Sequence, residues 1–122
     1  SLEMGGYLFE VRKNIGLRPT GRRHYVDVVA RKDNQSILIS SKWQQVGGTV
    51  EQKIPFEVIC LIEALKNITP KFDKAYIVLG GEGMSIRDFY INGGLNKYIP
   101  DAIIVNIVTL EKFVSLSNRG ML

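Results

Sequence analysis

The sequence predicts a single α/β domain in which helices flank a central mixed sheet of about five strands. Two β-branched segments enclose a short polar connection, which is typical of a β-hairpin. A segment with helical apolar spacing then precedes an apolar run of strand length, and this succession favours a right-handed crossover between parallel strands. The length of 122 residues, 45% of them hydrophobic, is that of one domain with its own core.

The first third of the chain carries three predicted strands. Residues 5–15 alternate apolar and charged side chains, which favours an edge strand. The Pro and Gly content of residues 16–21 predicts a loop. Residues 25–30 and 37–43 are rich in Val and Ile, and we expect them to pair as the hairpin.

The middle of the chain predicts a helix followed by a buried strand. Thr49 and Gln52 have the spacing of a helix-capping box, and the main helix should begin near Ile54 or Pro55, where Pro is well tolerated. Four apolar residues at three-and-four spacing form its expected inward face: Val58, Leu61, Ile62 and Leu65. Residues 74–79 are continuously apolar after the first, as in a strand buried on both faces.

The last third adds a helix, a strand and a helix. Ser85 and Asp88 have the spacing of a cap for a short helix that runs to about Tyr90. Residues 102–108 predict another buried strand, and Thr109 should cap a terminal helix. The expected order is therefore strand, hairpin, helix, strand, helix, strand, helix.

Composition narrows the class of protein. A single cysteine, Cys60, excludes an internal disulfide and a multi-cysteine zinc site, and its apolar neighbours predict a buried, inert thiol. The chain lacks a membrane-spanning apolar run and a signal-peptide pattern, so we expect a cytoplasmic protein with no membrane partner. Residues 1–3 resemble a cloning remnant, which leaves residues 4–122 as the expected single domain.

The charge distribution favours a polyanionic partner. The formal net charge is +4, and half of the sixteen basic residues lie in the first third of the chain. These eight are Arg12, Lys13, Arg18, Arg22, Arg23, Arg31, Lys32 and Lys42.

The hairpin brings an acid and a base together. If Asp33 and Asn34 form a two-residue turn, Asp27 lies opposite Ser40, and Lys42 lies on the diagonal at roughly 7 to 8 Å. An aspartate and a lysine so placed can converge on one water or ion. Because Asp27 stands among valines, we expect it to be buried and to need a partner or a cation.

The segments 21–30 and 37–44 resemble the PD-(D/E)XK nuclease superfamily, which includes restriction enzymes, Holliday junction resolvases and repair nucleases. The first segment is similar to the one that carries the superfamily's metal-binding aspartate, and the second to the strand with its acid-x-lysine element. The resemblance implies a three-layer restriction-endonuclease-like core over most of residues 7–108. A helix that usually precedes the opening strand is not evident.

The resemblance has one departure, because Ser40 stands where the acid of the acid-x-lysine element is expected. A subset of restriction enzymes with this pattern takes the second carboxylate from the next helix. The two candidates are Glu51 and Glu57, and Glu51 is favoured because the turn after Gly47-Gly48 returns the chain toward the strand ends. Glu57 can instead be a first-turn acid favoured by the helix dipole.

The resemblance implies a mechanism and partners. Asp27, Glu51 and the Ser41 carbonyl would bind Mg²⁺ or Mn²⁺, and Lys42 would orient or activate the attacking water. The substrate would be DNA, and two copies can act as a homodimer to reach both strands. Five residues are candidates for nucleic-acid contact: Arg22, Arg23, His24, Gln44 and Gln52. Glu10 could also approach the site if the first strand lies beside the hairpin.

Three functions compete. The first is a metal-dependent nuclease of restriction, repair or junction-resolving type. The second is a catalytically degenerate nucleic-acid-binding module on the same fold, which Ser40 favours. The third is a protein-interaction or regulatory domain of a larger assembly. Apart from these functions, Asp27 and Lys42 can form only a structural salt bridge or a solvated pair.

Overall fold

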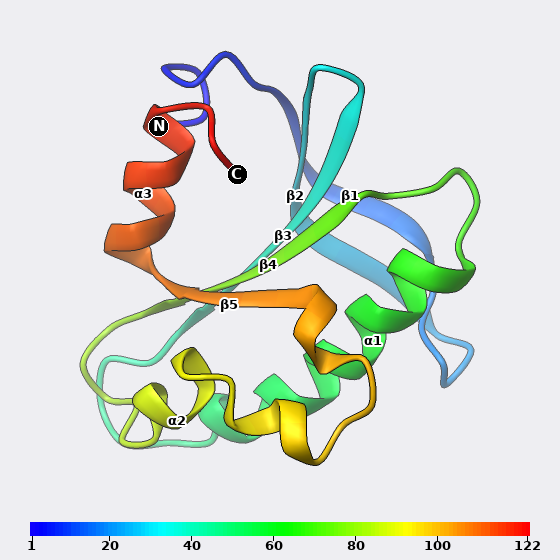
Figure 1. The fold of residues 1–122 in the computed structure, drawn as a ribbon. Helices are drawn as coiled ribbons and strands as arrows, with labels where there is room; N and C mark the ends of the chain where they lie inside the picture. Colours follow the sequence, from blue (N-terminus) through cyan, green and yellow to red (C-terminus); the bar gives the residue numbers. More distant parts are fainter.

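A computed structural model describes all 122 residues as three layers, with a central five-stranded sheet between two layers of helix (Figure 1). The strands are β1 (Leu8–Leu17), β2 (Arg23–Lys32), β3 (Gln35–Trp43), β4 (Lys74–Gly80) and β5 (Val105–Thr109). The helices are α1 (Ile54–Asn67), α2 (Arg87–Ile91) and α3 (Leu110–Asn118), with short 3₁₀ helices η1 (Val50–Lys53), η2 (Gly94–Lys97) and η3 (Ala102–Ile104). The α/β class, the mixed sheet and the order of elements are confirmed.

The sheet follows chain order from β1 to β5. The first three strands are antiparallel, and β3, β4 and β5 are parallel, joined by α1 and by the α2 segment. Asp33 and Asn34 form the two-residue turn with φ of 52° and 66°, the left-handed backbone that a tight hairpin requires. Val28 pairs with Ile39, so the predicted hairpin register is confirmed.

Each face of the sheet buries its own apolar cluster. The larger cluster of 17 residues joins the sheet to α1 and α2, and Val58 and Leu61 of α1 are fully buried in it, as predicted. The second cluster of nine residues joins the opposite face to α3. The strand β3 therefore contributes to both apolar clusters.

Several element boundaries differ from the expected ones. β1 continues through Leu17, so part of the predicted loop is strand. Residues before α1 form η1, and Thr49 makes no side-chain cap, so the predicted capping box is wrong. Pro55 does lie in the first turn of α1, where its missing N–H has no cost.

The last third shows two further corrections. The Ser85 side chain does not cap α2, because its hydroxyl instead donates to Glu51. The strand β5 begins only at Val105, because Asp101 has a left-handed φ of 66° and the next three residues form η3. Thr109 does cap α3, since its Oγ1 accepts a hydrogen bond from the Lys112 amide at 3.2 Å.

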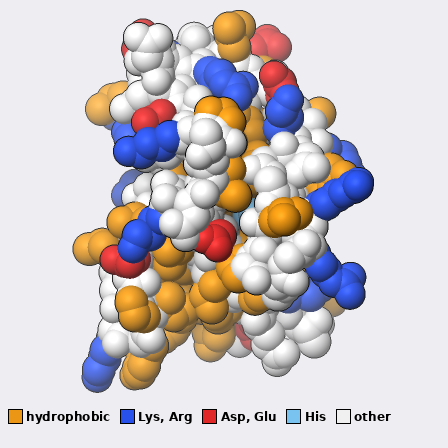
Figure 2. All heavy atoms as spheres, turned by 90° about the vertical axis from the view of Figure 1, so that its right-hand side faces the viewer, with side chains coloured by type: hydrophobic (Ala, Val, Ile, Leu, Met, Phe, Trp, Pro, Cys, Tyr) orange, Lys and Arg blue, Asp and Glu red, His pale blue; other side chains and the backbone are white.

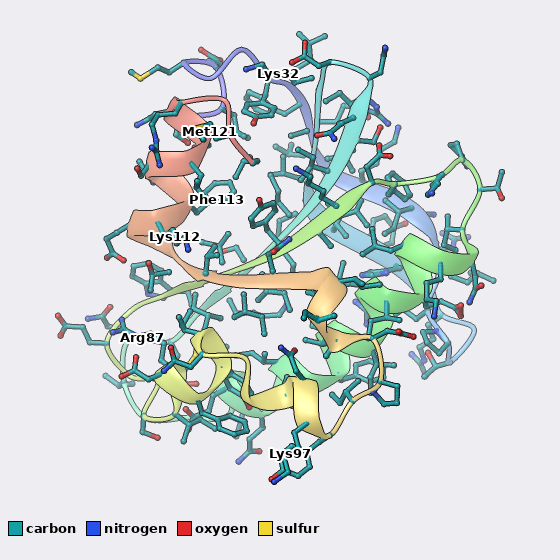
Figure 3. The ribbon with its side chains drawn as sticks, viewed as in Figure 1. Lys32, Arg87, Lys97, Lys112, Phe113 and Met121 are labelled. Atoms are coloured by element: carbon teal, nitrogen blue, oxygen red, sulfur yellow. The ribbon has the colours of Figure 1, made fainter.

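The two ends of the chain meet beside α3 (Figure 1). The Lys32 ammonium donates to the Gly5 carbonyl at 2.7 Å and lies over the Tyr7 ring, and Figure 3 shows Lys32 at the end of the molecule that also holds Met121. The Tyr7 hydroxyl accepts from the Leu122 amide at 2.9 Å. No helix precedes β1, and none in the chain combines the length and apolar character needed to cross a membrane.

The two threonines that precede helical turns provide a matched pair of variants. Thr109→Ala should lower the free energy of unfolding by about 1 kcal/mol, because it removes a side-chain cap. Thr49→Ala should change it by less than about 0.5 kcal/mol, because this side chain makes no cap. Urea unfolding monitored by circular dichroism measures both, and equal effects would contradict the difference in capping.

Candidate active site

The end of β3 presents a lysine to the first turn of α1. Ser40 and Lys42 alternate onto the face that packs on α1, where Ser40 is buried. The Lys42 Nζ lies 3.0 Å from Oε2 of Glu57, whose side chain comes from α1. Glu57 is only 8% exposed, whereas 22% of the Lys42 side chain is exposed, so the ion pair is partly shielded from water.

His24 on β2 contacts the same carboxylate from the interior. Its Nε2 lies 3.2 Å from Glu57 Oε1, and the residue is 1% exposed. Because an ionised carboxylate only accepts hydrogen bonds, Nε2 must carry the proton, and Nδ1 is left buried without a partner. The sequence prediction of His24 as a nucleic-acid contact is therefore wrong in this fold, because the side chain does not reach the surface.

Glu57 is held in its charged form. Burial raises its pKa, but the hydrogen bond from His24 and the charge of Lys42 together outweigh burial, and the pKa falls from 4.5 to about 2. A negative charge is thus fixed between two nitrogen donors from neighbouring strands. From the sequence, Glu57 is a candidate for the second carboxylate but Glu51 is favoured, and the other interpretation of Glu57 is a first-turn acid.

Asp27 lies where the β2–β3 ladder ends. Its Oδ2 accepts a hydrogen bond from the Ser41 amide at 2.6 Å. Asp27 directly precedes Val28, and Ser41 lies two residues beyond Ile39, the partner of Val28. The side chain is exposed, so the expectation of a buried aspartate is wrong. The reason is a break in alternation: Val26 and Val29 both face the larger cluster although three residues apart, and Asp27 falls within this break.

The two carboxylates therefore contact consecutive residues of one strand. Asp27 bonds Ser41, and Glu57 pairs with Lys42. Asp27 and Lys42 form no ion pair with each other, so the simple structural salt bridge is not what the fold contains.

Glu51 is directed toward the start of α2. Its carboxylate accepts from the Ser85 hydroxyl at 3.3 Å and from the Ile86 amide at 3.2 Å. Its backbone carbonyl accepts from the Tyr90 hydroxyl at 2.7 Å. Because η1 precedes α1, Glu51 lies on the side of the chain that faces α2, and the structure brings Glu57 to Lys42 in its place.

The Gln44 side chain is hydrogen-bonded to the backbone at both ends. Its amide donates to the Gly83 carbonyl at 2.8 Å, and its Oε1 accepts from the Glu51 amide at 3.1 Å. The side chain is buried with both ends occupied, which corrects its expected role as a nucleic-acid contact. Arg22, Arg23 and Gln52 are exposed, as such contacts must be.

Glu10 lies away from this cluster. It is exposed on β1 and pairs with Lys13 at 2.8 Å and with Arg31 at 3.7 Å. The structure therefore does not bring it to Lys42.

A cavity of about 300 Å³ opens beside Lys42 and Glu57. Its other lining residues are Arg18, Gln52, Lys53, Phe56 and Cys60. Cys60 is buried, as predicted, and burial raises the pKa of its thiol, as does the nearby Glu57 charge. The thiol therefore stays protonated and is not a nucleophile.

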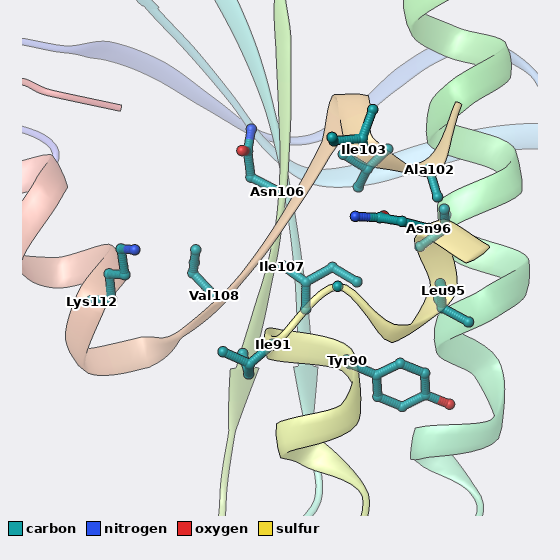
Figure 4. A pocket seen from close by; sticks show the side chains of 13 residues that line it. Tyr90, Ile91, Leu95, Asn96, Ala102, Ile103, Asn106, Ile107, Val108 and Lys112 are labelled. Atoms are coloured by element: carbon teal, nitrogen blue, oxygen red, sulfur yellow. The ribbon is translucent and has the colours of Figure 1, made fainter. Parts of the chain in front are cut away.

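A second cavity, of about 210 Å³, lies between β5 and the α2–η3 segment (Figure 4). Its lining is mostly apolar, and Lys112 is its only charged residue. It contains no acid–base pair.

The donor set suits a hard divalent cation. Mg²⁺ prefers oxygen ligands and is often held by one or two carboxylates together with waters and substrate phosphates. Asp27 and Glu57 supply two carboxylates at adjacent residues of β3, and no group of three acidic, histidine or cysteine side chains converges on one point. The structure therefore contains two carboxylates of the ligand type that Mg²⁺ prefers, but no assembled site of three such side chains.

Comparisons with known proteins concern the fold and the family of the chain. A comparison with solved structures finds the crystal structure of a protein of unknown function, AF1548, with a TM-score of 0.53 and 13% sequence identity. The match covers 88% of this chain and 52% of that one, so this chain spans about half its length, and the likeness is one of fold. A comparison with curated proteins finds no match.

The family model described as the PD-(D/E)XK nuclease superfamily domain matches residues 8–121, which include β1 through α3. This match extends over nearly the whole chain, and the observed five-stranded mixed sheet has the topology expected for it. The chain belongs to the PD-(D/E)XK nuclease superfamily.

Proposed function

We propose that this chain is a metal-dependent nuclease that hydrolyses DNA phosphodiester bonds, of restriction, repair or junction-resolving type. The observation that carries the proposal is the buried Lys42–Glu57 ion pair directly beside the Ser41 amide that anchors Asp27. Carboxylates and a lysine are the side chains that phosphodiester hydrolysis requires, and here they contact the last residues of β3.

The second carboxylate in this proposal is Glu57. Ser40 cannot supply a charge, and the Glu51 carboxylate is bonded to Ser85 and Ile86. Glu57 reaches Lys42 from the helix that follows β3, so a carboxylate on α1 replaces the one missing from the strand.

Each residue has a defined task. Asp27 and Glu57 would hold Mg²⁺ or Mn²⁺, together with the Ser41 carbonyl, and a bound ion supplies stabilisation of the charge that develops on the phosphate. The Lys42 ammonium would orient the attacking water, since it donates hydrogen bonds and Glu57 restrains its position. His24 is a positioning residue, because it acts on the reaction only through Glu57.

The surface around the site supports a polyanionic substrate. Arg22 and Arg23 are exposed at the start of β2, the strand that also carries His24 and Asp27. Figure 2 shows Lys and Arg side chains spread over the face that is turned to the right in Figure 1. Such side chains suit contacts with backbone phosphates, which position nucleic acid without reading its sequence.

A second candidate function is a non-cleaving nucleic-acid-binding module. Two observations favour it: Ser40 replaces an acid, and the Glu57 charge is already balanced by Lys42 and bonded by His24. Salt-sensitive DNA binding without cleavage in Mg²⁺ or Mn²⁺ would identify this function.

Substitutions at the two carboxylates and the lysine test the nuclease. Asp27→Asn, Lys42→Met and Glu57→Gln should each reduce cleavage of plasmid DNA by about 100-fold or more while DNA binding persists. Glu51→Gln is the matched control and should retain cleavage, because its carboxylate is directed toward α2. Gel assays of cleavage and binding, with circular dichroism of each variant, make the comparison.

The exposed Asp27 keeps this test independent of folding, because an Asn there can still accept from the Ser41 amide. Unchanged cleavage in both Asp27→Asn and Lys42→Met would overturn the nuclease proposal. Loss of cleavage in Glu51→Gln but not in Glu57→Gln would return the second carboxylate to Glu51.

The pKa of Glu57 predicts a pH dependence of stability. Since the folded pKa of about 2 lies below the ordinary 4.5, the charged carboxylate stabilises the fold fully above pH 4.5. That contribution is lost as the pH falls from 4.5 through about 2. The difference in unfolding free energy between the native chain and Glu57→Gln should therefore shrink in this window, measured by urea unfolding. A difference that stays constant across the window would show that the pKa is not lowered.

A further inference from the structure

We propose that the cavity beside Lys42 is a binding subsite for one phosphate group of the substrate strand, with Arg18 as its main ligand and Lys53 as its second cation. This inference rests on the proposed nuclease function, and it adds a residue that neither the superfamily match nor the sequence motifs identify. The ligand is a phosphate mono- or diester, either at a strand end or within the strand next to the scissile bond.

The main chain fixes Arg18 at the edge of the cavity. The Arg18 amide donates to the Arg22 carbonyl at 2.7 Å, and the Arg18 carbonyl accepts from the Gly21 amide at 2.9 Å. Pro19 follows Arg18 in this tight turn, where its restricted φ is favoured. Both backbone groups of Arg18 are thus bonded within one turn, which holds its main chain at the edge of the cavity.

The Arg18 guanidinium is incompletely bonded. Its Nε is buried and has no hydrogen-bond partner, although buried donors are almost always paired. Apart from Arg18, the only other buried polar side-chain atom without a partner is His24 Nδ1, which does not line the cavity. Arg18 lines the cavity, and its planar guanidinium fork matches phosphate oxygens, so an anion in the cavity would pair with its charge.

The cavity carries excess positive charge. Three cations line it, Arg18, Lys42 and Lys53, against one acid, Glu57. Glu57 is already bonded by Lys42 and His24, and neither Arg18 nor Lys53 forms an ion pair with any carboxylate. The charge at this cavity is therefore unbalanced until an anion binds.

The position of Lys53 strengthens the same conclusion. Lys53 is the N-cap residue of the 14-residue helix α1, and a cation there meets the positive end of the helix dipole. The charge of Lys53 therefore destabilises the start of the helix. An anion bound between the lysine and the helix end would offset this unfavourable interaction. The volume of about 300 Å³ is at the small end of ligand pockets, suitable for one phosphate with part of its nucleoside.

Nuclear magnetic resonance of the metal-free protein tests the subsite apart from cleavage. Inorganic phosphate should shift the Arg18 Nε–H resonance, and Arg18→Gln should weaken phosphate binding about tenfold. Lys97→Gln is the matched control, because it removes the same charge from η2, outside the cavity, and it should bind phosphate like the native chain (Figure 3). An unshifted Arg18 resonance, or equal weakening in both variants, would overturn the subsite.

Short single-stranded oligonucleotides then distinguish the two sources of phosphate. If the subsite takes a strand end, Arg18→Gln should weaken binding only of oligonucleotides that carry a terminal phosphate. If it takes an internal phosphate, the loss should be the same with and without the terminal group, and either pattern supports the subsite. Because no metal is present, a chain that fails to cleave DNA can still bind phosphate, so failure of the subsite and failure of the nuclease are separate results.

Discussion

The candidate site depends on one buried carboxylate, Glu57, held between Lys42 and His24. The three residues come from α1, β3 and β2, so this contact fixes the helix against the two strands that carry the site. Removing one partner of a buried ion pair costs about 3 to 5 kcal/mol, because the remaining charge is left uncompensated. The contacts of Glu57 therefore fix the position of the Lys42 ammonium and stabilise the packing of α1 on β2 and β3.

The same contact explains how the chain accommodates Ser40. A second acid at that position would bring another negative charge beneath Lys42, next to the charge that Glu57 already supplies. Ser40 is small and buried there, and the longer side chain of Glu57 pairs with Lys42 from α1. In the proposed nuclease, the carboxylate has moved from the strand to the helix while its partner lysine has stayed in place.

Much of the fold could be predicted because local signals agree with tertiary packing. The hairpin register followed from the two-residue turn at Asp33 and Asn34, and the buried face of α1 followed from its apolar spacing. Asp27 was identified by its pattern, but its exposure depends on a break in strand alternation that the valines around it conceal.

The choice between Glu51 and Glu57 was beyond sequence reasoning, because a 3₁₀ turn before α1 decides which acid faces β3. His24 was misjudged for a related reason: a histidine beside two arginines looks like surface, whereas β2 begins early enough to turn it inward. In the sequence, nothing distinguishes Arg18 from the other basic residues. Its distinguishing feature, a buried Nε without a partner, exists only once the strands and α1 are packed.

The central claim is that Asp27 and Glu57, beside Lys42, form the metal-binding centre of a nuclease. A crystal soaked in Mn²⁺ tests it directly, because anomalous scattering locates the ion independently of activity. The account predicts a Mn²⁺ peak in contact with the Asp27 and Glu57 carboxylates. A peak at Glu51, or no peak at Asp27 and Glu57, would contradict it.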